Sequence, residues 1–184
     1  MLTSFHTVAT VCLAWLSVFV QTAAPSLQPW VGTQPDFLPA LMVHTALRTS
    51  VWNVVLLGLL GGFMLDSVSG NPVGVSCLPL GLVGWLLHGR RDFILREQTF
   101  AQFILGFGAG AAVPFLTGVL LLSLGRQPLV GWNSVVPWTV LALSSGLATP
   151  LMFRLFRQVE RWFAFRKPEP GTFRPDREIR RGRQ

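Results

Sequence analysis

The chain has 184 residues, of which 51% are hydrophobic and only 12% are charged. This composition excludes an ordinary soluble domain, in which about 25% of residues are charged, and indicates an all-α membrane protein. The net charge of +7 comes mainly from the C-terminal tail, where basic residues follow an apolar segment. Such a tail is expected to contact anionic lipids, and the charge gives no reason to expect nucleic-acid binding.

Six apolar segments follow one another along the chain, and we predict that each is a transmembrane helix: 4–22, 36–47, 51–68, 72–88, 100–124 and 134–153. The first is interpreted as a retained helix, because no Lys or Arg precedes it as in a signal peptide. The second is too short to span a bilayer unaided, since spanning takes about 20 residues. It is therefore expected to be surrounded by protein.

Basic residues predict the orientation of these helices. Arg48 and the cluster of Arg90, Arg91 and Arg96 lie in alternate connections, and a basic tail follows the last helix. By the positive-inside rule, both termini and these connections are predicted to face the cytoplasm. The chain is thus predicted to comprise a six-helix membrane domain, 1–165, and a basic tail, 166–184, which has too few apolar residues to fold alone.

The third segment carries the most informative pattern. Gly58 and Gly62 are spaced for close helix packing, and Asp66 follows four residues later. An aspartate costs about 2.5–3.5 kcal/mol at the centre of a membrane helix. Asp66 therefore either binds backbone N–H groups of the following turn, or makes a polar contact with another helix, a partner or a ligand. Asn71 is expected to cap the fourth helix, with Pro72 in its first position.

The fifth segment contains a second glycine face, formed by Gly106, Gly108 and Gly110. Packing within the chain is a simpler explanation for it than a dimer interface. The histidines are scattered over different segments, and no catalytic, metal-binding or cofactor-binding motif is present. The sequence therefore predicts neither an enzyme nor a bound cofactor.

One combination of residues resembles a known family, the rod shape-determining protein MreD. A Pro-Asp pair opens the second helix, and a G-x-x-x-G-x-x-x-D-x-x-x-G-x-x-x-G frame follows it. These positions are Pro35, Asp36, Gly58, Gly62, Asp66, Gly70 and Gly74. The last helix, with Pro150 followed by apolar and basic residues, is also similar.

The resemblance implies a non-enzymatic inner-membrane component of the bacterial cell-wall elongation machinery. Members bind the periplasmic scaffold MreC and work with the MreB filament, RodA and a penicillin-binding transpeptidase. Their fold is similar to that of the substrate-binding subunit of energy-coupling-factor transporters, and the seven residues above become candidates for partner binding or for a structural motif. The alternative is a small-molecule-binding transporter subunit, for which the candidate pocket residues are Asp36, His44, Asn53 and Asp66.

Overall fold

The computed structural model describes residues 2–23, 35–92, 94, 98–126 and 135–164. These residues form six α-helices and no strand: α1 (Leu2–Ala23), α3 (Leu38–Arg48), α4 (Val51–Ser69), α5 (Cys77–Gly89), α6 (Thr99–Ser123) and α7 (Val135–Ala164). The predicted segments agree with these helices within a few residues, with two exceptions. The fourth helix begins at Cys77 rather than at Pro72, and the last continues to Ala164.

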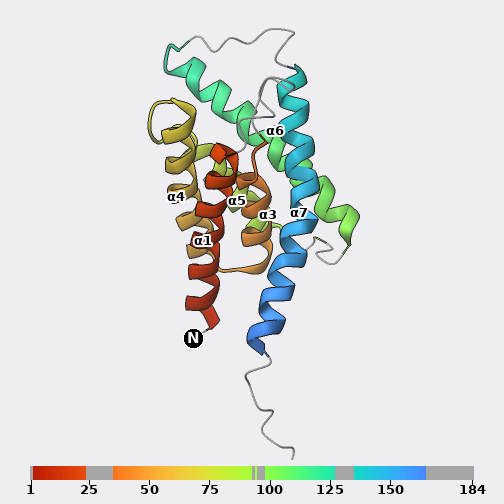
Figure 1. The fold of residues 1–184 in the computed structure, drawn as a ribbon. Coiled ribbons are helices and arrows are strands. Elements are labelled where there is room, and N and C mark those ends of the chain that lie inside the picture. Colours follow the sequence, from red (N-terminus) through yellow and green to blue (C-terminus); the bar gives the residue numbers. More distant parts are fainter. Residues whose placement is uncertain (1, 24–34, 93, 95–97, 127–134, 165–184) are drawn as a thin grey trace, which may run out of the picture.

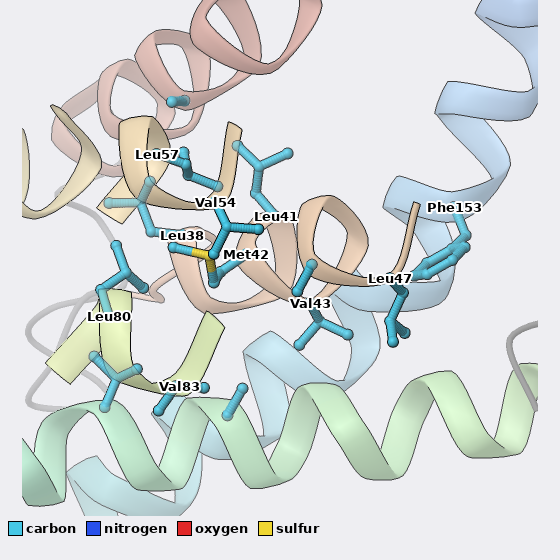
Figure 2. Packing of buried hydrophobic residues seen from close by; sticks show 14 of the residues in the cluster. Leu38, Leu41, Met42, Val43, Leu47, Val54, Leu57, Leu80, Val83 and Phe153 are labelled. Atoms are coloured by element: carbon cyan, nitrogen blue, oxygen red, sulfur yellow. The ribbon is translucent and has the colours of Figure 1, made fainter. Parts of the chain in front are cut away.

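The short helix α3 is the centre of the molecule. Every residue from Leu38 to Leu47 is buried, and α3 packs against each of the other five described helices. Leu41, Met42 and Val43 point to different sides of it into the hydrophobic core (Figure 2). The burial of α3 agrees with its predicted enclosure by protein, and it includes the two polar side chains within this stretch, His44 and Thr45.

The helices run alternately up and down around α3. The start of α1 and the end of α7 lie at one end of the bundle, together with the connection between α3 and α4 (Figure 1). The turn between α4 and α5 and the end of α6 lie at the opposite end. This arrangement is the one that an even number of antiparallel passes requires.

The apolar surface identifies a membrane protein. α4, α6 and residues Val135–Val159 of α7 are long and apolar enough to cross a membrane, whereas α5 and residues Thr7–Thr22 of α1 are shorter apolar helices. Large apolar side chains such as Trp15, Trp85 and Leu147 are more than half exposed on the outside of the bundle, as expected of helices that face lipid. The predicted basic tail, 166–184, lies outside the described residues.

Candidate functional site

The glycine frame packs α4 tightly against α5. A Cβ atom at Gly58 would lie 3.0 Å from Cα of Gly81, and one at Gly62 would lie 2.5 Å from Cα of Cys77. Residues four apart lie on the same helix face, so Gly58 and Gly62 together allow the two backbones to touch. In the absence of side chains here, dispersion contacts between the helices replace lipid contacts.

Asp66 continues this face and connects α4 to the start of α5. Its side chain is 1% exposed. Oδ2 accepts a hydrogen bond from the N–H of Gly74 at 2.7 Å and another from the N–H of Ser76 at 3.1 Å. Ser76 immediately precedes α5, where backbone N–H groups lack partners within the helix and the helix dipole favours a negative charge. Asp66 therefore supplies the acceptor that the first turn of α5 requires.

The predicted capping of the fourth helix by Asn71 and Pro72 is wrong. Residues 72–76 form a turn instead, in which the N–H of Val75 donates to the carbonyl oxygen of Pro72. Gly74 has a φ of +95°, which cannot be accommodated in a right-handed helix. The helix consequently starts later, at the point where Asp66 binds the backbone.

Gly70 and Gly74 allow the chain to reverse. Gly70 ends α4 with a φ of +68°, and both glycines lie in the left-handed region that a side chain disfavours. All five positions of the frame are thus brought together in one hairpin. Gly58 and Gly62 set the distance between its helices, Asp66 holds its second helix, and Gly70 and Gly74 shape its turn.

Asp36 makes a second contact of the same chemical type at the start of α3. Its Oδ1 accepts hydrogen bonds from the N–H of Leu38 at 2.9 Å and from Nε2 of Gln21 at 2.8 Å. Gln21 belongs to the last turn of α1 and is 4% exposed. Asp36, which follows Pro35, therefore joins the end of α1 to the start of α3. The sequence analysis missed Gln21, because nothing in its local pattern distinguishes it.

The remaining polar candidates lie apart from one another and have separate partners. Oγ1 of Thr7 donates to Oδ1 of Asn53 at 2.8 Å. The imidazole of His44 stacks on the ring of Phe156, with 3.8 Å between centroids, and meets Phe153 edge-on. Within the described parts of the chain, no group of three His, Cys, Asp or Glu residues could hold a metal ion.

The second glycine face packs α6 against α7. A Cβ atom at Gly110 would lie 2.5 Å from Cβ of Ser145, and one at Gly106 would clash with Oγ1 of Thr149. Gly108 does not belong to this face, since a Cβ there would meet no atom within 4 Å. The predicted face is therefore corrected to the two glycines that are four residues apart, and their contacts lie within the chain.

An all-helical bundle with an apolar exterior, close glycine contacts and carboxylates that bind the starts of helices defines a multi-helix membrane protein. Comparison with known families gives its identity more closely. The family model of the rod shape-determining protein MreD matches residues 1–159. The chain belongs to this family, which confirms the resemblance and assigns the chain to rod-shape determination as a structural component. No solved structure matches the chain significantly.

Proposed function

We propose that the chain is a non-enzymatic inner-membrane component of the cell-wall elongation machinery. It binds MreC and thereby connects wall synthesis outside the membrane to the MreB filament inside, in a larger complex with RodA and a penicillin-binding transpeptidase. The observation that carries this proposal is the family match over residues 1–159. The structure adds a helix arrangement that suits a multi-pass protein.

The proposed topology has six passes with both termini in the cytoplasm. Arg48, Arg90 and Arg91 follow helices that run toward the same end as the start of α1, whereas Arg126 follows α6 at the opposite end. This distribution agrees with the positive-inside rule. With 11 residues, α3 is only about 16 Å long, so it would pass through the middle of the bundle without contacting lipid. The likeness to the substrate-binding subunit of energy-coupling-factor transporters stays a prediction.

The frame residues are proposed to act on MreC through the turn that they hold. Asp66 itself is too buried to offer a contact surface. The turn beside it is exposed, with Val68 at 45% and Val73 at 63% exposure. Because this end of the bundle is the predicted periplasmic end, the turn is suitably placed for a periplasmic scaffold. Pro35 and Asp36 would fix the neighbouring end of α3 in the same way.

The test is complementation of cell shape in a rod-shaped bacterium that is depleted of its own copy of the protein. The wild-type chain is expected to restore rods, whereas Val73→Lys, which alters the exposed turn without touching the core, is expected to leave cells rounded at equal membrane abundance. The matched control is Ser67→Lys in the last turn of α4, an exposed position next to this turn, with cell shape compared at equal membrane abundance. Cells that stay rod-shaped after depletion would refute the proposal.

The transporter-subunit alternative receives no support from a specific observation. It requires a polar pocket that is open to the outside, formed by Asp36, His44, Asn53 and Asp66. In the structure, Asp36 and Asp66 cap different helices, Asn53 binds α1, and His44 lies between two phenylalanine rings. A hollow of about 650 Å³ is present, but it is lined mainly by apolar side chains.

A further inference from the structure

An open apolar groove runs along α5 between α4 and α6. Its volume is about 650 Å³. One wall includes Val55 and Leu59 of α4, the floor includes Gly81 and Trp85 of α5, and the other wall includes Leu116 and Leu120 of α6. His88 is one of the few polar residues in the lining. The groove therefore suits a hydrocarbon occupant along most of its length.

The groove exists because α5 is short and has a glycine, Gly81, near its centre. Thirteen residues give α5 a length of about 20 Å, against about 30 Å for the hydrocarbon core of a bilayer. A Cβ atom at Gly81 would meet no atom within 4 Å, so no protein atom fills the groove at this position. Leu82 and Trp85 are 54% and 68% exposed, and whatever fills the groove can reach them directly.

Positive charge gathers at one end of this groove. His88 lies in the last turn of α5, and Nη1 of Arg91 is 3.3 Å from its Nε2. Arg90 precedes Arg91 and is exposed. Asp92 lies beside them, with its Oδ1 3.8 Å from Nε of Arg91. Among the described residues of this stretch, Arg90, Arg91 and Asp92 together carry a net positive charge where the apolar lining ends.

We propose that this groove binds an anionic phospholipid of the cytoplasmic leaflet, with an acyl chain along α5 and the phosphate at Arg90 and Arg91. An amphiphile with a negative headgroup and an apolar chain is complementary to an apolar groove that ends at two arginines. An apolar partner helix would leave these arginines without an anionic partner from the occupant. The leaflet follows from the proposed orientation of the bundle, but not from binding to MreC. Arginines at an anionic membrane surface favour binding by about fivefold each.

The exposed indole of Trp85 provides the measurement. The purified full-length protein is reconstituted in nanodiscs with brominated phosphatidylglycerol or brominated phosphatidylethanolamine, and the Trp85 signal is taken as the difference between wild type and Trp85→Phe. The anionic lipid is expected to quench this signal at a severalfold lower mole fraction. Equal quenching by both lipids would overturn the proposal, and so would absence of quenching, which would indicate that protein fills the groove.

Two variants separate the head site from the chain site. Replacing both arginines by glutamine is expected to abolish the preference for the anionic lipid, while quenching by both lipids persists. The matched control is Arg126→Gln, because Arg126 follows α6 at the opposite end of the bundle. Gly81→Leu fills the groove and is expected to reduce quenching by both lipids. Its control is Gly108→Leu, which also places a side chain in open space. Retention of the headgroup preference without Arg90 and Arg91 would overturn the proposal, even if Gly81→Leu failed to fold.

Discussion

Replacing Gly62 by alanine tests the close packing of the α4–α5 hairpin. The new Cβ atom would lie 2.5 Å from Cα and 2.6 Å from N of Cys77, whereas ordinary van der Waals contact begins at 3.4 Å. The helices must therefore separate locally by about 0.9 Å, since the clashing atoms belong to the backbone. Overpacking of this kind typically costs about 1–3 kcal/mol.

Gly108→Ala is the matched control, because it adds the same methyl group to a helix where nothing lies within 4 Å. The gain in helix propensity from glycine to alanine, about 1 kcal/mol, is common to both variants and cancels in the difference. We expect the free energy of unfolding of Gly62→Ala to be about 1–3 kcal/mol below that of Gly108→Ala in reversible unfolding from mixed micelles. Equal stabilities would refute the close backbone contact.

Three further predictions follow from the hydrogen bonds and the second glycine face. Asp66→Ala removes a charged acceptor from two N–H groups and should lower the free energy of unfolding by about 2–5 kcal/mol, with faster amide exchange at Gly74 and Ser76; unchanged exchange there would contradict this role. Asp36→Ala should lower the free energy of unfolding by less, about 1–2 kcal/mol, because Asp36 is only half-buried. A decrease as large as that of Asp66→Ala would contradict this ranking of the two aspartates. Gly106→Leu should weaken the α6–α7 contact and increase protease cleavage between these helices, whereas cleavage equal to that of Gly108→Leu would argue against it.

The sequence predicted the helices well because each apolar run is bounded by polar residues, glycine or proline. It also predicted the enclosure of the second segment, since the run is too short to span a bilayer unaided. The start of α5 was missed for a tertiary reason. Its first turn is held by Asp66, which lies on another helix, and no local pattern around Pro72 reveals that contact.

The glycine faces show where spacing is informative and where it fails. Gly58 with Gly62, and Gly106 with Gly110, are four residues apart and face a neighbouring helix, as the periodicity predicts. Gly108 is two residues from each neighbour, which turns it about 200° around the helix, and it points into open space. The bond between Gln21 and Asp36 was not predictable, because it joins the ends of two helices across a long connection.

We propose that this protein acts in rod-shape determination by binding MreC. The most direct measurement is affinity purification of the tagged full-length chain from membranes in mild detergent, followed by detection of MreC. We predict that MreC co-purifies with the wild-type chain and that Val73→Lys reduces its recovery at equal yield of the chain. Absence of MreC from the wild-type eluate, together with unchanged cell shape on depletion, would contradict the account.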